Sequence, residues 1–249
     1  HLRWREAYAH RWYCRYREAL TSAREGTHQS QQAGDPLLTA MCRREIGLAC
    51  RVLGDYAAAR KALDQALSLF VELGETVYEI HTLGNLATLC WYEGAHEQAL
   101  QISTRALNRC DEAGLTLQRR LPLGDMGASA VAMGALDLAR QSLEESLAIA
   151  RLTADRTQEI LCLVHLGWLA VRLGQGEKAL ASFKAGLTLA ERIRSCSEQS
   201  WLKAGLAEAY RLIGEPKKAL GYARQAEKLA RDSGAAYDQK LARWVLGRL

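Results

Sequence analysis

Apolar residues recur along this chain at the spacing of helix faces. Between residues 38 and 53 they follow the i, i+3, i+4, i+7 pattern of one helical stripe, at Ile46, Ala49, Cys50 and Leu53. A second stripe follows between residues 56 and 73, at Ala59, Leu63, Ala66, Leu67 and Phe70. No stretch alternates with period two over a useful length, so the pattern predicts helices and no strands.

The same pattern returns every forty residues. One glycine column and one alanine column keep this period: Gly54, Gly94, Gly134, Gly174 and Gly214, and Ala19, Ala59, Ala99, Ala139, Ala179 and Ala219. A fixed period of this length predicts an all-α solenoid, in which each unit of two helices buries its apolar face against its neighbours. Within a unit, Gly54 is expected to end the first helix and Asp55 to cap the second.

The forty-residue period divides the whole chain into repeated units. We expect one solenoid domain over 1–249, with units at 1–34, 35–74, 75–114, 115–154, 155–194 and 195–234 and a partial first helix at 235–249. The chain begins at His1 and stops within a first helix, so we expect a fragment of a longer protein. Two columns of small residues, one containing Gly47 and Gly127 and the other Gly26 and Gly186, predict where helices cross and where successive pairs stack.

A family resemblance rests on a Leu-Gly pair, a Gly-Asp-Tyr turn and two later alanines: Leu166-Gly167, Leu246-Gly247, Gly54-Asp55-Tyr56 seven residues after Gly47, then Ala59 and Ala66. This succession resembles the tetratricopeptide repeat, whose usual unit has about 34 residues. The longer unit found here is similar to repeats of bacterial signalling proteins, such as ATP-dependent transcription regulators of the maltose-activator type. The resemblance implies a right-handed superhelix of about six antiparallel helix pairs, with the first helices lining a concave groove.

The sequence contains no motif typical of catalysis, nucleotide binding or metal binding. It contains no phosphate-loop, dinucleotide or zinc-protease motif, and no histidine pair with ligand spacing, so we predict no enzyme, catalytic residue, metal or cofactor. The net charge is +5, and the basic residues are spread over all units, which argues against direct nucleic-acid binding. No apolar run is long enough for a membrane span. Seven cysteines without a CxxC pair predict no disulfides and a cytoplasmic location.

Tryptophan and arginine gather on one face of the first helices. If the face of residues 46, 50 and 53 pairs with the second helix, residues equivalent to 41, 44, 48, 51 and 52 lie on an adjoining face, and all six tryptophans map there. In tetratricopeptide proteins the corresponding positions line the groove, so the candidate binding residues are Trp4, Arg11, Trp12, Arg44, Arg51, His81, Asn85, Trp91, Tyr92, Trp168, Arg172, Trp201 and Arg211.

Two functions remain open. In the first, the aromatic and guanidinium groups bind a protein or peptide segment or a small-molecule effector, and the chain is the sensing or interaction arm of a larger bacterial signalling or transcription-regulating protein. In the second, the tryptophans simply pack between adjacent first helices, and the chain is a structural scaffold that mediates self-association.

Overall fold

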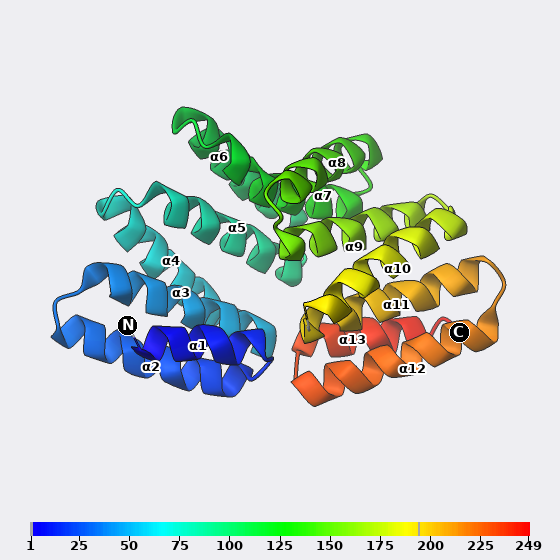
Figure 1. Ribbon diagram of the computed structural model, residues 1–249, viewed down its shortest axis with the longest axis horizontal. Coiled ribbons are helices and arrows are strands. Elements are labelled where there is room, and N and C mark those ends of the chain that lie inside the picture. The colour runs from blue at the N-terminus through cyan, green and yellow to red at the C-terminus, as the bar shows by residue number, and fades with distance from the viewer. Residues whose placement is uncertain (1, 194) are drawn as a thin grey trace. The chain divides into compact units, whose positions relative to one another are not determined.

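The computed structural model describes residues 2–193 and 195–249, apart from the side chains of residues 196 and 197. The boundaries predicted at residues 1 and 194 therefore lie outside the described residues. This part of the chain folds into thirteen α-helices without a strand, which confirms the all-α solenoid (Figure 1). None of the described helices is long and apolar enough to cross a membrane.

The helices fall into two compact units. Unit 1, residues 1–118, contains α1 (Leu2–Trp12), α2 (Tyr16–Gln32), α3 (Pro36–Leu53), α4 (Tyr56–Glu72), α5 (Thr76–Glu93) and α6 (His96–Glu112). Unit 2, residues 119–249, contains α7 (Arg120–Met133), α8 (Leu136–Leu152), α9 (Arg156–Arg172), α10 (Gly176–Arg192), α11 (Cys196–Leu212), α12 (Pro216–Ser233) and α13 (Ala236–Leu246). A 3-10 helix, η1 (Thr116–Arg119), precedes α7.

Within each unit every helix packs on the next one along the chain. The first helices of the pairs also contact one another in succession, α1 with α3 and α3 with α5 in unit 1, and α7, α9, α11 and α13 in unit 2. We call these two sets the first-helix rows. The predicted helix limits differ only at their ends: α3 begins at Pro36, α4 ends at Glu72 and α13 ends at Leu246.

The turns contain the helix-ending glycines and the helix cap that the sequence predicts. The glycines of the Gly54 column adopt positive φ, 88° at Gly54 itself, and end the first helices. Asp55 accepts a hydrogen bond from the Ala58 amide and caps α4. Cys14 holds the position of the Gly54 column after α1, and Ala154 holds the turn after the second helix α8, forty residues after Gly114. Their φ values are 57° and 54°, a conformation that costs non-glycine residues roughly 1–2 kcal/mol. Cys14 is also disulfide-bonded, so the prediction of no disulfides is wrong, and the cysteines no longer support a reducing compartment.

The two small-residue columns lie where helices touch. A Cβ on Gly47 of α3 would sit 2.5 Å from the Leu63 side chain of α4, the second helix of the same pair. A Cβ on Gly186 of α10 would sit 2.6 Å from Leu202 of α11, in the next pair. Both distances are shorter than the closest approach of two non-bonded carbon atoms. The helices can therefore pack this closely only because Gly47 and Gly186 carry no side chain.

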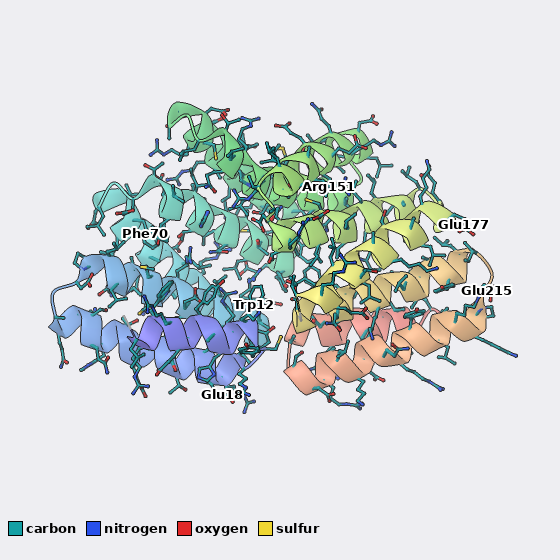
Figure 2. All side chains as sticks on the ribbon, in the orientation of Figure 1. Trp12, Glu18, Phe70, Arg151, Glu177 and Glu215 are labelled. Atoms are coloured by element: carbon teal, nitrogen blue, oxygen red, sulfur yellow. The ribbon has the colours of Figure 1, made fainter. Side chains whose placement is uncertain are left out.

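The alanine column forms the centre of each pair. All six members are at most 1% exposed. Ala139 of α8 packs with Ala130 and Val131 of α7, the first helix of its own pair, as predicted. Phe70 is fully buried inside unit 1, whereas Glu215 lies at the outer edge of unit 2, beside the start of α12 (Figure 2).

Ala139→Glu is expected to lower the free energy of unfolding by more than about 3 kcal/mol, because it buries a carboxylate with no partner in a closed alanine contact. Gln141→Glu adds the same charge on the exposed side of α8 and should change stability by less than about 0.5 kcal/mol. Urea denaturation of both variants measures the difference. Similar stability of the two variants would contradict the alanine register.

Candidate functional site

A buried carboxylate joins two arginines in the first-helix row of unit 1. Glu45 of α3 has no exposed side-chain surface, and its Oε2 accepts a 2.7 Å hydrogen bond from Arg11 Nε of α1. Its Oε1 lies 3.7 Å from Arg44 Nη2 and accepts no hydrogen bond. Two guanidinium groups therefore share one carboxylate, which leaves one positive charge in excess at this site.

The charges of this cluster shift one another's pKa values. Burial lowers the pKa of Arg44 below its ordinary value; the Glu45 carboxylate opposes this shift, and the Arg11 charge adds to it. The pKa of Arg11 is raised: burial alone would lower it, but the charge and hydrogen bond of Glu45 outweigh burial. The cluster thus depends on Glu45 to keep both cations within the protein.

Three arginines of this row, Arg11, Arg44 and Arg51, each lie over a tyrosine ring. The guanidinium carbon of Arg11 is 5.2 Å from the Tyr8 ring centre, and the corresponding distances are 5.6 Å from Arg44 to Tyr78 and 4.9 Å from Arg51 to Tyr92. The buried Nε atoms of Arg44 and Arg51 have no hydrogen-bond partner. Guanidinium groups held over rings in this way have few rotamers left to lose when they bind a ligand.

The remaining candidates of unit 1 lie around this row. Trp91 contacts the Tyr92 ring edge-on at 5.5 Å and His96 at 6.2 Å. His81 Nε2 is 3.3 Å from the Gln118 side-chain oxygen. Asn85 on α5 and Trp12 at the end of α1 are both half-buried.

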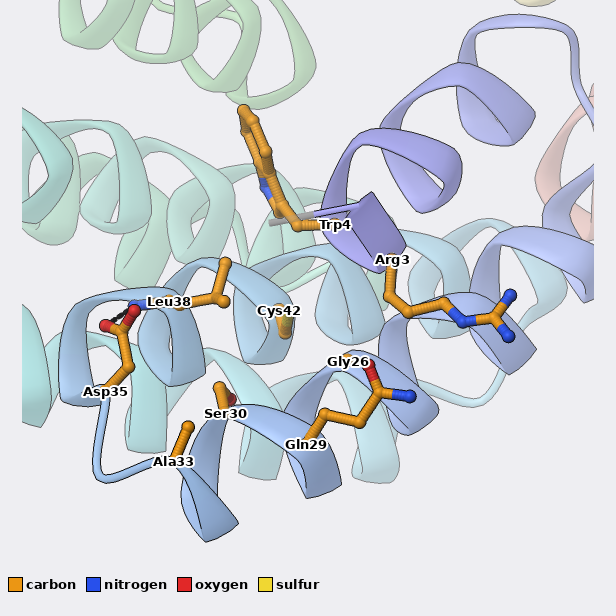
Figure 3. Close-up of a pocket in the computed structure, with 9 residues that line it drawn as sticks. All are labelled: Arg3, Trp4, Gly26, Gln29, Ser30, Ala33, Asp35, Leu38 and Cys42. Atoms are coloured by element: carbon orange, nitrogen blue, oxygen red, sulfur yellow. Dashed lines mark hydrogen bonds between the residues drawn. The ribbon is translucent and has the colours of Figure 1, made fainter.

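A cavity of about 280 Å³ lies beside Trp4 (Figure 3). It is formed by the start of α1, the second half of α2 and the start of α3, with Trp4, Leu38 and Cys42 on its apolar side and Ser30 and Asp35 on its polar side. The Trp4 indole nitrogen has no hydrogen-bond partner. A space of this size holds one or two amino-acid side chains, so at least one predicted tryptophan borders a volume that a ligand can enter.

Two tryptophans of unit 2, Trp168 and Trp201, are more closely packed. Trp168 contacts Phe183 at 5.6 Å and Trp244 at 6.3 Å, and it belongs to two apolar clusters. Trp201 is 8% exposed and donates a 2.6 Å hydrogen bond from its indole nitrogen to buried Asp238 of α13. These two rings therefore connect α9, α11 and α13, and they offer a ligand little surface.

Polar residues of unit 2 also bridge its first helices. Buried Glu208 of α11 accepts a hydrogen bond from Arg211, 2.9–3.0 Å away, and lies 3.4 Å from Arg248, beyond the end of α13. Arg172 is exposed and donates to the Ala132 carbonyl at 3.4 Å. His165 lies 6.3 Å from the Trp201 ring, and burial lowers its pKa to about 4.

The sequence prediction missed the buried carboxylates that pair with its candidate arginines and with Trp201. Glu45, Glu208 and Asp238 are each at most 3% exposed on first helices. The first two occupy different columns of the repeat, so the period does not reveal them. The available signal is an acidic residue one to three positions from an arginine within an otherwise apolar helix, as at Arg44-Glu45 and at Glu208 with Arg211.

Glu45→Gln is expected to lower the free energy of unfolding by about 3 kcal/mol, because it leaves two largely buried guanidinium groups without a counter-charge. Glu112→Gln is the matched control: its carboxylate also pairs with an arginine, Arg109, but is 63% exposed, so the loss should stay below about 1 kcal/mol. Urea denaturation at neutral pH compares the two variants, and equal small losses would show that Glu45 does not hold the cluster.

Comparison with known proteins gives a family and a set of similar folds. A family model described as the tetratricopeptide repeat matches residues 37–112 and 119–192, more than half of the chain. No curated protein sequence matches the chain at a significant level.

Several solved structures share the fold at low sequence identity. A Rap protein complexed with competence and sporulation factor is 12% identical with a TM-score of 0.71, over 98% of this chain and 71% of that one. The apo form of RapI is 14% identical with a TM-score of 0.67, over 100% and 98% of the two chains.

A third similar structure is a signal transduction ATPase with numerous domains from Pyrococcus horikoshii, which carries a tetratricopeptide repeat sensor. It is 15% identical with a TM-score of 0.57, and the match covers 94% of this chain and 38% of that one. Identities this low establish the fold alone. Together with the family match, the forty-residue period and the packed helix pairs, they lead to one conclusion: this chain belongs to the tetratricopeptide repeat family.

Proposed function

We propose that the chain binds a protein or peptide segment through its first-helix rows and is the sensing or interaction arm of a larger bacterial signalling or transcription-regulating protein. Tetratricopeptide repeats are protein-interaction modules, which supports the general function. The Rap protein that shares the fold is complexed with a competence and sporulation factor, and the signal transduction ATPase carries its repeats as a sensor. Both support a sensing arm.

One observation supports the first-helix row of unit 1 as the binding surface. In unit 1, three arginines lie over tyrosine rings, and two of them keep a buried Nε without a hydrogen-bond partner. Arginine and large aromatic residues dominate binding energy in protein interfaces, because they combine apolar area with several donors. An extended peptide offers carbonyl oxygens for the guanidinium groups and side chains for the rings and the cavity beside Trp4.

The thirteen predicted residues contribute unequally to this proposal. Arg11, Arg44, Arg51, Trp91 and Tyr92 gather around the first-helix row of unit 1 and form its centre. Others are assigned to packing within unit 2: Trp168 and Trp201 contact neighbouring helices, and Arg211 pairs with Glu208. His81, Asn85 and Trp12 flank the proposed surface in unit 1, whereas Arg172 lies at the end of α9 in unit 2. A small-molecule effector remains a second ligand class for the cavity beside Trp4.

The larger protein is proposed by analogy. A regulator of the maltose-activator type, in which ligand binding to the repeats biases a nucleotide switch, agrees with the similarity to the repeat-bearing ATPase, and a cytoplasmic location belongs to the same proposal. Binding to the repeats would act by stabilising one state of the attached switch. A nucleotide-switch domain in the same polypeptide would support this proposal.

Self-association is the alternative, and exposed apolar residues favour it. Leu152 at the end of α8 is 76% exposed and Trp244 of α13 is 47% exposed. A scaffold built on such contacts would show concentration-dependent assembly and no dependence on the arginines of unit 1.

Arg51→Ala and Trp91→Ala are each expected to weaken peptide binding by about 2 kcal/mol while leaving the melting temperature nearly unchanged. Peptides selected from a random library on the immobilised chain provide the probe, and tryptophan fluorescence titration gives the affinities. Arg105→Ala, on the exposed face of α6, is the control and should bind as tightly as the unmutated chain.

Trp168→Ala should instead destabilise unit 2 without a selective loss of binding, since it removes contacts to Phe183 and Trp244. Unchanged affinity in both the Arg51 and Trp91 variants would refute the proposed surface. If no peptide binds and fluorescence depends only on protein concentration, the scaffold function stands.

A further inference from the structure

The outer face of α12 carries a row of cations. Its basic residues stand at positions i, i+7, i+11 and i+14, namely Lys217, Arg224, Lys228 and Arg231. Gly221 stands between the first two, at position i+4. All five residues are exposed. At 1.5 Å per residue the row is roughly 21 Å long. The opposite side of the helix is buried through Ala219, Ala223, Ala226 and Ala230. We call the four basic residues the α12 stripe.

These four charges are not neutralised within the protein. Among the described side chains, none of the four makes an ion pair or a side-chain hydrogen bond. The acidic residues of the same helix, Glu227 and Asp232, flank the stripe without coming within pairing distance of it. The neighbouring Lys218, which lies outside the stripe, does pair, at 3.3 Å from Glu215. The stripe therefore presents four uncompensated cations to solvent.

The corresponding faces of the other second helices carry different charges. Positions 40, 80, 120 and 160 residues earlier include at least one acidic residue on each of α4, α6, α8 and α10, for example Asp64, Glu97, Asp137 and Glu177. The face of α2 carries two arginines and a histidine. Only α12 among the described helices carries four basic residues and no acidic residue at these positions, so the repeat itself does not require the stripe.

Part of the stripe works against the helix that carries it, although Arg231 in the last turn complements the helix dipole. Lys217 lies in the first turn of α12, which has no acidic residue, and a cation there opposes the helix dipole. Arg224 and Lys228 are four residues apart and Lys228 and Arg231 three apart, so like charges face each other along the surface. Each effect costs a few tenths of a kcal/mol, and a docked anion would offset both.

We propose that the α12 stripe is a docking surface for an acidic protein segment, separate from the first-helix rows. A helix or extended strand with carboxylates at similar spacing matches a straight row of this length. The exposed face of α12 has no aromatic residue on which bases could stack, which disfavours single-stranded nucleic acid. Among its described large apolar residues only Leu220, at 36%, is exposed, which is too little for insertion into a membrane surface.

The test uses fluorescein-labelled octaglutamate and fluorescence anisotropy at about 50 mM salt, where charge contacts are weakly screened. The quadruple variant K217Q/R224Q/K228Q/R231Q should lose at least tenfold in affinity. The matched control K61Q/R105Q/R140Q/K178Q removes four exposed cations from α4, α6, α8 and α10 and gives the same net charge. It should bind within about twofold of the unmutated chain, because octaglutamate contacts α12 alone.

Two further measurements, of the melting temperature and of binding to a DNA duplex, complete the test. Neutralising the stripe should leave the melting temperature nearly unchanged, because it relieves like-charge repulsion but also removes the favourable Arg231 charge from the last turn of α12, so the binding loss cannot be ascribed to unfolding. Equal losses in both quadruple variants would overturn the proposal, since net charge alone would then explain binding. Tighter binding of a short DNA duplex than of octaglutamate, lost in the stripe variant, would also overturn it and assign the surface to nucleic acid. Neither result bears on peptide binding to unit 1.

Discussion

The close approach of neighbouring helices is the constraint on which the structure depends. Phe183 of α10 shows it best, because its fully buried ring lies against two glycine backbones, Gly167 of α9 and Gly205 of α11. A Cβ at either position would lie 2.3–2.5 Å from the ring. The Gly47–Leu63 and Gly127–Leu143 contacts have the same form in other pairs. Since each pair is held by its neighbours in this way, the period of small residues determines the fold.

This packing also determines where function can reside. The buried face of each helix is taken up by alanines, glycines and aliphatic side chains, so polar residues of the first helices remain along their rows. There the arginines need counter-charges, and buried Glu45 and Glu208 supply them within the protein. Because Glu45 is shared by two arginines, unit 1 keeps an excess of guanidinium groups lying on tyrosine rings, whereas much of the aromatic surface of unit 2 is used for packing.

The sequence predicted the fold well because its determinants repeat. The Gly54 turn and the buried alanine column are each read from a single column, and the structure confirms them, as it confirms the Asp55 cap, which does not repeat. The site was harder to predict, because Trp91, Trp168 and Trp201 share a face of the repeat and yet have different surroundings. A ring is exposed or buried according to residues that do not repeat, such as Phe183 and Asp238. The α12 stripe was hidden for another reason: a count of charges per unit does not show that four of them share one exposed face.

The most direct test of the packing constraint compares two glycine-to-alanine changes. Alanine normally stabilises a helix interior by about 1 kcal/mol relative to glycine. Gly221→Ala, where a Cβ meets no other atom within 4 Å, should show that gain in the free energy of unfolding. Gly167→Ala places a Cβ against the Phe183 ring and should instead lose about 2 kcal/mol or more, within the range for overpacking. If both changes stabilise the protein, close helix contact at the small-residue columns does not hold this fold together.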